Sequence, residues 1–100
     1  MREIDIDQAA AEIERGAKLV DVREPAEYRE GHVPGAVNVP MSQLSGRLGE
    51  IQRDRPVYVV CASGNRSSAM TDVLAAAGFD AVNVGGGTAA WIRSGRTIEK

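Results

Sequence analysis

The sequence predicts an α/β domain built on a parallel β-sheet, and three observations lead to this prediction. Short apolar, β-branched runs alternate along the chain with segments of helical spacing, as they do in parallel α/β proteins. The run at residues 57–60 is almost continuously apolar, which is expected of a strand covered on both faces. The length of 100 residues suits one core, since two halves would each be too small to bury one.

Five runs are expected to form the strands of this sheet. Four of them are rich in valine and leucine, and the fifth, near the amino terminus, is weaker. In chain order the runs are Glu3 to Ile6, Leu19 to Val22, Ala36 to Val39, Val57 to Val60 and Ala81 to Val84.

The first two helices are marked by residues typical of helix ends. Asp7 is expected to cap a helix that reaches about Arg15. Glu24 and Pro25 are expected to begin the second helix, because proline is tolerated in a first turn, and Gly31 is expected to end it.

Three further helices are expected in the second half of the chain. The spacing of Leu44, Leu48 and Ile51 favours one helix, which Gly46 and Gly49 weaken. The clearest helix runs from about residue 66 to 77, stops at Gly78, and is expected to bury one face that carries Met70, Val73, Leu74 and Ala77. The last covers about residues 88–93, with Thr88 as its cap.

The charge and the apolar runs of the chain argue against two classes of partner. The net charge of -2 provides no excess of Lys and Arg to neutralise phosphates, so no nucleic-acid partner is expected. The longest apolar run, residues 57–62, is too short for a membrane span or a signal peptide. We therefore expect no membrane association and a cytoplasmic location.

The chain contains one cysteine, Cys61, and one histidine, His32. Cys61 therefore has no internal disulfide partner, and these two residues are too few for a structural zinc site. We expect neither a metal nor a cofactor. A free cysteine of this kind is either a small buried hydrophobe or a reactive thiol.

The position of Cys61 favours the reactive thiol. Cys61 follows the most apolar run and precedes the clearest helix, so we expect it at the carboxyl end of a strand, where open α/β sheets bind ligands. The connecting turn is short, and Gly64 and Asn65 are residue types that accept positive φ most easily. Such a turn, with Ala62 as its first residue after the cysteine, can direct its backbone N–H groups toward the sulfur.

Those donors and the amino terminus of the helix favour a thiolate over a thiol and make an anion-binding concavity. Arg66 adds a permanent cation able to meet a sulfur oxyanion, and Ser63 and Ser67 can donate further hydrogen bonds. The structural alternative is a buried cysteine beside an ordinary turn, with Arg66 paired to Asp72 or to another nearby carboxylate.

Four motifs in order extend this interpretation. They are residues 19–23 with Glu27 and Tyr28, residues 31–40 (Gly-His-Val-Pro-Gly-Ala-Val-Asn-Val-Pro), the loop from Cys61 to Ser67, and Gly86-Gly87 with Ala90-Trp91. With these motifs the chain resembles the rhodanese family over essentially its whole length, as one rhodanese-like domain at residues 1–100. The resemblance implies a three-layer domain, a five-stranded parallel sheet with helices on both faces.

The resemblance also implies a sulfurtransferase whose Cys61 becomes a persulfide. The cysteine would take a sulfane sulfur from a donor such as thiosulfate or a persulfide and pass it to cyanide or a thiol, with a sulfur-relay protein as a further partner. Two alternatives stay open: a non-catalytic or redox-sensing module of the same fold, and a phosphatase or arsenate reductase. The four residues between Cys61 and Arg66 match the rhodanese loop, whereas the related phosphatases have a longer one.

The chain departs from the family pattern at two positions. Two-domain rhodaneses carry basic residues where this chain has Ser63 in the loop and Glu27 before it. The missing charges put efficient use of thiosulfate, a dianion, in doubt and leave a protein-bound or small-thiol persulfide as a donor.

Four other residues are expected to support the site. We expect His32 to organise a turn rather than act as a base, because a thiolate needs no base. Asp21 and Arg23 are expected on opposite faces of a strand, with Asp21 hydrogen-bonded to a neighbouring loop and Arg23 paired with Glu27. Trp91 is expected to anchor the core and to wall one side of the pocket.

Overall fold

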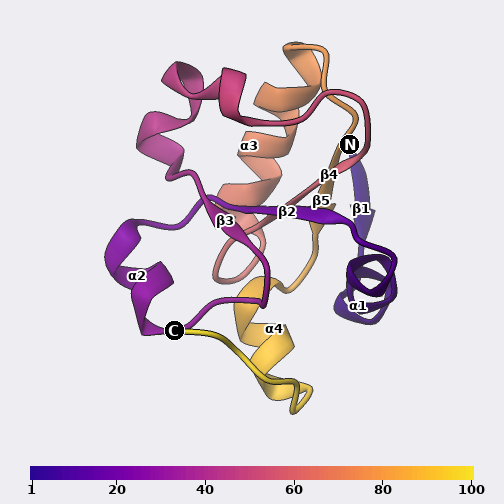
Figure 1. Cartoon of the computed structure of the whole chain (residues 1–100), viewed down its shortest axis with the longest axis vertical. Coiled ribbons are helices and arrows are strands. Elements are labelled where there is room, and N and C mark those ends of the chain that lie inside the picture. Colours follow the sequence, from indigo (N-terminus) through magenta and orange to yellow (C-terminus); the bar gives the residue numbers. More distant parts are fainter.

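The computed structural model describes residues 1–100 and contains one parallel five-stranded sheet (Figure 1). The strands lie in the order β1-β5-β4-β2-β3, so β4 occupies the centre. Their bounds are β1 Arg2–Ile4, β2 Lys18–Asp21, β3 Val37–Asn38, β4 Val57–Val60 and β5 Ala81–Val84. The predicted α/β class is confirmed, and β4 and β5 have the predicted bounds.

Four α-helices and two short 3-10 helices connect the strands (Figure 1). The α-helices are α1 Ile6–Glu14, α2 Pro25–Glu30, α3 Asn65–Ala76 and α4 Gly87–Arg93. The 3-10 helices are η1 Met41–Gly46 and η2 Leu48–Glu50. None of these helices combines the length and the apolar character that crossing a bilayer would take.

The alternation of side chains along β4 divides the core between the two faces of the sheet. Val57 and Val59 pack with Leu44, Leu74 and other residues of the α3 side. Tyr58 and Val60 point the other way and pack in a second cluster with side chains of α1 and α4. Helices therefore cover both faces, as predicted.

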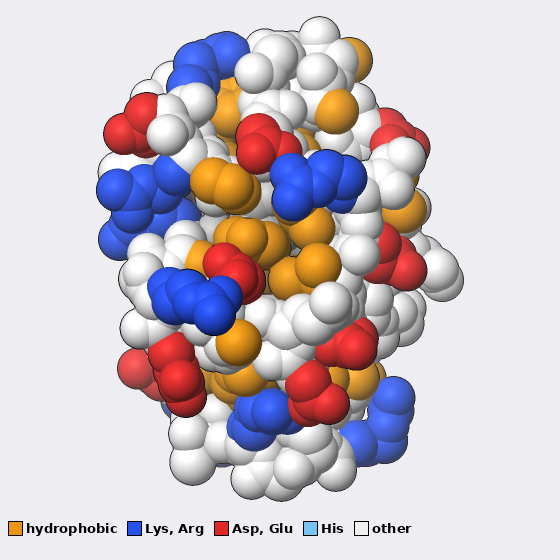
Figure 2. All heavy atoms as spheres, turned by 90° about the vertical axis from the view of Figure 1, so that its right-hand side faces the viewer, with side chains coloured by type: hydrophobic (Ala, Val, Ile, Leu, Met, Phe, Trp, Pro, Cys, Tyr) orange, Lys and Arg blue, Asp and Glu red, His pale blue; other side chains and the backbone are white.

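One face of the molecule, to the right in Figure 1, is shown in Figure 2. Basic and acidic side chains are interspersed there around a small central apolar area. This face therefore carries no patch of a single sign of charge.

Three predicted helix ends or types are wrong. The cap of α1 is Asp5, whose side chain accepts from the N–H of Gln8 at 2.8 Å while Gln8 accepts from the N–H of Asp5 at 2.9 Å. The cap of α4 is Gly86 with φ of 80°, rather than Thr88. The segment from Leu44 to Ile51 forms two 3-10 helices instead of one α-helix.

The predicted buried face of α3 is also partly wrong. Val73 is 41% exposed, whereas Leu74 is fully buried. The remaining buried positions are polar, because Ser67 and Thr71 turn inward, where the Thr71 hydroxyl donates to the carbonyl of Ser67 at 2.7 Å. Apolar spacing alone could not identify that face, since two of its positions carry hydroxyl groups.

Neighbouring residues of α3 provide a test of this packing. Leu74→Ala should lower the free energy of unfolding by about 2–5 kcal/mol, because it leaves a cavity between α3 and the sheet. Val73→Ala should change it by no more than about 0.5 kcal/mol, because that side chain is on the surface. Urea unfolding of both variants measures the difference, and equal losses would contradict the observed helix orientation.

Candidate active site

The loop that follows the central strand places Cys61 at the carboxyl edge of the sheet. β4 ends at Val60, and α3 begins at Asn65 after Gly64, whose φ of 107° makes the sharp turn. The carbonyl of Cys61 accepts from the N–H of Thr88 at 2.8 Å, and that of Ala62 accepts from Ala89 at 2.9 Å. Hydrogen bonds from the first turn of α4 therefore fix the position of the loop that contains Cys61.

Two donors converge on the sulfur of Cys61. The N–H of Gly64 lies 3.1 Å from Sγ, and the hydroxyl of Ser67 lies 3.2 Å from it. Burial by itself would raise the pKa of this thiol, but hydrogen bonds from the Ser67 hydroxyl and from the N–H groups of Ser67, Gly64 and Ser63 lower it below its ordinary value. The site thus favours a thiolate at a position that is only 1% exposed.

The other loop residues contribute through the backbone. Ser63 and Asn65 have exposed side chains, and Ser63 acts on the sulfur through its N–H group. Ala62 is half-buried and is held by α4. The predicted side-chain hydrogen bond from Ser67 is present, whereas the side chain of Ser63 makes none.

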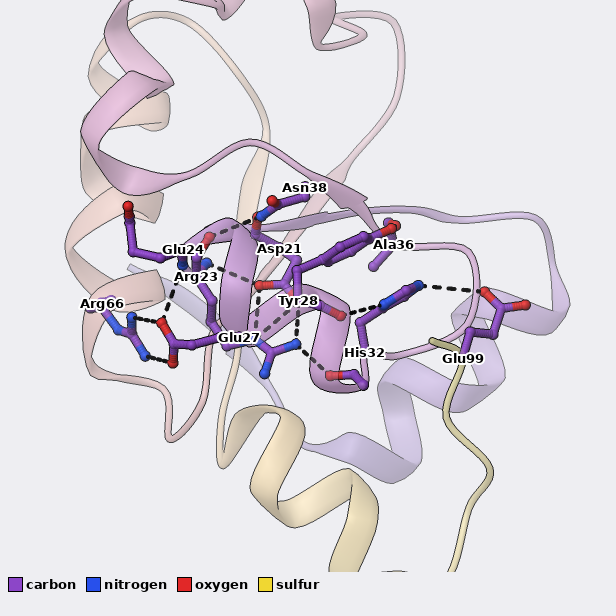
Figure 3. A network of polar contacts seen from close by, with 11 residues as sticks. Asp21, Arg23, Glu24, Glu27, Tyr28, His32, Ala36, Asn38, Arg66 and Glu99 are labelled. Carbon is purple, nitrogen blue, oxygen red and sulfur yellow. Dashed lines mark hydrogen bonds and ion pairs between the residues drawn. The ribbon is translucent and has the colours of Figure 1, made fainter.

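Arg66 forms a bidentate ion pair with Glu27 of α2 (Figure 3). Its two terminal nitrogens lie 2.7 and 2.9 Å from the two carboxylate oxygens of Glu27. The hydrogen bond from Arg66 lowers the pKa of Glu27 to about 2, and Glu27 in turn raises the pKa of Arg66. The expected alternative, a pairing of Arg66 with Asp72 or another nearby carboxylate, is therefore met by Glu27 and not by Asp72.

Asp21 and Arg23 form a buried pair with each other, which corrects the predicted partner of Arg23. The Asp21 carboxylate also accepts from the backbone N–H of Arg23 at 3.0 Å, which is a hydrogen bond to the loop after β2. The Arg23 guanidinium donates to Asp21 at 2.9 and 3.1 Å and to the carbonyl of Gly31 at 2.8 Å, so it does not pair with Glu27. The prediction of opposite faces is wrong as well. Residues two apart share a face of a strand, and the chain leaves β2 directly after Asp21.

Residues 5–94 match the family model described as "Rhodanese-like domain". The chain belongs to the rhodanese-like family.

Relatives of this rhodanese-like chain include three bacterial proteins. "Uncharacterized protein YqhL" of Bacillus subtilis is 44% identical over 78 residues, which are 77% of this chain and 62% of that protein. A protein named "Sulfurtransferase" from Allochromatium vinosum is 42% identical over 80% of this chain and 76% of its own length. "Thiosulfate sulfurtransferase GlpE" of Pseudomonas syringae is 36% identical over 90% of this chain and 86% of its own.

Solved structures of rhodanese-like proteins superpose closely on the chain. A rhodanese-related protein from Thermoplasma volcanium has a TM-score of 0.93 at 33% identity, covering 99% of this chain and 98% of its own. A rhodanese-like domain protein from Staphylococcus aureus has a TM-score of 0.86 at 35% identity, covering 91% of each chain. The sheet order and the layers of helices are therefore those of the family.

In this rhodanese-like domain His32 lies on the side of α2 away from Arg66 (Figure 3). Its Nδ1 lies 2.8 Å from the carbonyl of Tyr28, which can only accept, so Nδ1–H donates. Its ring stacks on Tyr28 with the centroids 3.7 Å apart, and its Nε2 lies 3.8 Å from Glu99. The two contacts with Tyr28 hold His32 against α2, and the contact with Glu99 reaches the carboxyl-terminal segment.

Trp91 is buried in the cluster between the sheet and the helices α1 and α4. Its Nε1–H donates to the carbonyl of Thr97 at 2.8 Å. Cys61 packs in the cluster on the other face of the sheet. Trp91 is thus a core anchor, and none of these contacts joins it to the cysteine.

Sequence reasoning missed the role of Gly87 in shaping the rhodanese loop. Its φ is 58°, and a Cβ there would overlap the carbonyl oxygen of Cys61 and lie 2.8 Å from the carbonyl of Ala62. Only glycine lets α4 approach the loop closely enough for its N–H groups to bind these carbonyls. The run of three glycines at 85–87 was the available signal.

The thiolate can be tested through its hydrogen bonds. Ser67→Ala should raise the pKa of Cys61, because the variant loses a donor that stabilises the anion, so the thiolate should appear at higher pH than in the native protein. Ser63→Ala is the control, because alanine keeps the backbone N–H through which Ser63 acts. The ultraviolet absorbance of the thiolate follows both titrations, and identical midpoints for native protein and Ser67→Ala would rule out the proposed stabilisation.

The close approach of α4 leads to a second test. Gly87→Ala should lower the free energy of unfolding by about 2 kcal/mol or more. Alanine is disfavoured in the left-handed conformation of residue 87, and its Cβ would overlap the carbonyl oxygen of Cys61. Gly46→Ala should stay within about 1 kcal/mol, because its Cβ would meet no atom within 4 Å. Thermal and urea unfolding measure both, and a fully stable Gly87→Ala would show that α4 does not need this contact.

Proposed function

We propose that the protein is a sulfurtransferase in which Cys61 carries a sulfane sulfur as a persulfide. The observation that carries the proposal is the pair of hydrogen bonds from Gly64 and Ser67 to the Cys61 sulfur, which favour the thiolate at the carboxyl edge of the sheet. A thiolate is the nucleophile that sulfur transfer requires. The named sulfurtransferases among the relatives support the same assignment.

The first step loads the enzyme. The Cys61 thiolate attacks the outer sulfur of a donor, and a bond forms between Cys61 Sγ and that sulfur. The sulfur–sulfur bond of the donor breaks, and its electron pair goes to the leaving group. Sulfite leaves when the donor is thiosulfate, and a thiolate leaves when it is a persulfide. The loop N–H groups stabilise the negative charge on the Cys61 sulfur and on the persulfide that replaces it.

The second step unloads it. A nucleophilic acceptor, such as cyanide or a thiolate, attacks the outer sulfur of the persulfide and returns Cys61 to its thiolate form. The hydrogen bonds from Gly64 and Ser67 stabilise the Cys61 thiolate both at the start of the cycle and at its end. The donor, the acceptor and a sulfur-relay protein are the partners that this cycle needs, and it needs no metal or cofactor.

A thiol that must stay reduced between cycles suits the cytoplasm, where cysteines are kept in that state. We therefore place the protein there. The short loop from Cys61 to Arg66 favours sulfur over the phosphate chemistry of the related phosphatases.

Mass spectrometry of the intact protein tests the proposal. Exposure to thiosulfate or to a thiol persulfide should add one sulfur atom to Cys61, and cyanide should remove it. Cys61→Ser should acquire no sulfur and should lose all sulfur transfer, because the hydroxyl stays protonated at neutral pH. Sulfur transfer by Cys61→Ser would overturn the proposal, and oxidation of Cys61 without any sulfur adduct would favour a redox sensor. Hydrolysis of a phosphate ester would favour a phosphatase.

A further inference from the structure

The ion pair between Glu27 and Arg66 cancels the charge of the one cation in the reactive loop. Glu27 reaches it from α2 with both carboxylate oxygens, at 2.7 and 2.9 Å, and also accepts from the N–H of Glu24 at 3.2 Å. Both side chains are about one-third exposed, so the pair stands at the surface of the site rather than inside it. A donor that approaches Cys61 meets a neutral pair instead of a free guanidinium.

Changes of pH near neutrality do not release this pair. The Arg66 hydrogen bond lowers the pKa of Glu27 to about 2, so Glu27 is ionised at every pH at which the protein would work. A carboxyl group with a lowered pKa loses its charge only as the pH falls through that value. The cancellation is therefore a permanent property of the site.

The second arginine beside the site cannot replace Arg66. The guanidinium of Arg23 is buried, its charge is balanced by Asp21, and its Nε and Nη2 donate to Asp21 and to the carbonyl of Gly31. A dianionic donor would have to displace Glu27 from Arg66 or bind next to the Glu27 carboxylate. The first course breaks the ion pair, and the second places the donor against a negative charge. The repulsion in the second course is twice as large for a dianion such as thiosulfate as for a monoanion.

We propose that Glu27 selects the sulfur donor, disfavouring thiosulfate and favouring a thiol persulfide of low net charge. This inference rests on the proposed function of Cys61 and assigns a substrate class to that site. Cys61 thiolate attacks the outer sulfur of R–S–SH, forms Cys61–S–SH, and releases R–S⁻, which takes a proton from solvent. The electron pair of the broken bond leaves with the carrier sulfur, so no oxidant or reductant is needed.

A hollow beside Glu27 agrees with a donor that has an organic carrier. Its volume is about 300 Å³, and it is lined by Arg23, Glu27, Glu30, Gly31, Ile92 and Ile98. Asp21 balances the charge of Arg23, which leaves the carboxylates and the two isoleucines to set the character of the lining. Ile92 is 51% exposed. Acidic and apolar surfaces of this kind suit an uncharged or cationic carrier better than a small dianion.

The test compares two donors on three proteins. Native protein, Glu27→Gln and Glu50→Gln are loaded with thiosulfate or with cysteamine persulfide, whose ammonium offsets the persulfide charge. Glu50→Gln is the matched control, because it removes the same charge from a similar two-pronged pair with Arg47, at 2.8 and 2.9 Å, outside the loop. The rate of sulfur addition to Cys61 is followed by mass spectrometry.

Glu27→Gln should raise kcat/KM for thiosulfate by about fivefold or more while changing that for cysteamine persulfide less than about twofold. The gain should shrink at high salt, because the freed charge of Arg66 is partly exposed and is screened. Glu50→Gln should leave the ratio of the two donors unchanged. Glu27→Ala serves as a second variant, and thermal unfolding verifies that both fold.

The outcomes separate this inference from the proposed function. If native protein acquires no sulfur from either donor, the sulfurtransferase proposal fails. If it acquires sulfur from both donors and neither Glu27 variant changes their ratio, only the assignment of Glu27 is overturned. A fall in thiosulfate use by the Glu27 variants would overturn it too, since it would show that the pair itself supports thiosulfate binding.

Discussion

The structure of the site depends on the hydrogen bonds that compensate a buried sulfur anion. Cys61 is 1% exposed, and a thiol so buried would normally keep its proton. Hydrogen bonds such as those from the Ser67 hydroxyl and the N–H of Gly64 outweigh the effect of burial and lower the pKa of Cys61 below its ordinary value. Their positions follow from the sheet: β4 delivers Cys61 at its carboxyl edge, and α3 begins within one turn of it.

The other side of the site depends on the buried pair of Asp21 and Arg23. The helix α2 has six residues, which is too short to be stable alone. Arg23 binds the carbonyl of Gly31 at the end of α2 while Asp21 holds its guanidinium from β2. The pair therefore fastens α2 to the sheet, and through α2 it positions the carboxylate of Glu27 opposite α3.

Local chemistry explains which parts of the fold could be predicted from the sequence. The strands β4 and β5 have the predicted bounds because their apolar runs are uninterrupted apart from Asn83. The cap of α1 could have been identified as well, since Asp5 and Gln8 have the spacing of a capping box and Asp7 has no such partner. The buried face of α3 could not, because its hydroxyl groups are buried only by contacts made after folding.

The same distinction holds for the site. The hydrogen-bond donors around the sulfur of Cys61 could be predicted because they lie within six residues of it along the chain. Glu27 was not identified as the partner of Arg66 because the two are 39 residues apart and meet only through the packing of α2 on the sheet. Asp72 was a weak alternative on geometry alone, since a residue six positions along a helix lies on another face.

In the proposed cycle, the reactivity of the nucleophile Cys61 and the selection of the sulfur donor are controlled by different groups. The groups that lower the pKa of Cys61 are hydrogen-bond donors from Ser67, Gly64 and Ser63, all within the loop and the first turn of α3. The pairing of Arg66 with Glu27 leaves these hydrogen-bond donors in place. The charge that an incoming donor meets is set instead by Glu27, from a separate element held by Asp21 and Arg23. On this proposal, a substitution at position 27 changes which sulfur donor reacts, while Cys61 remains the group that attacks it.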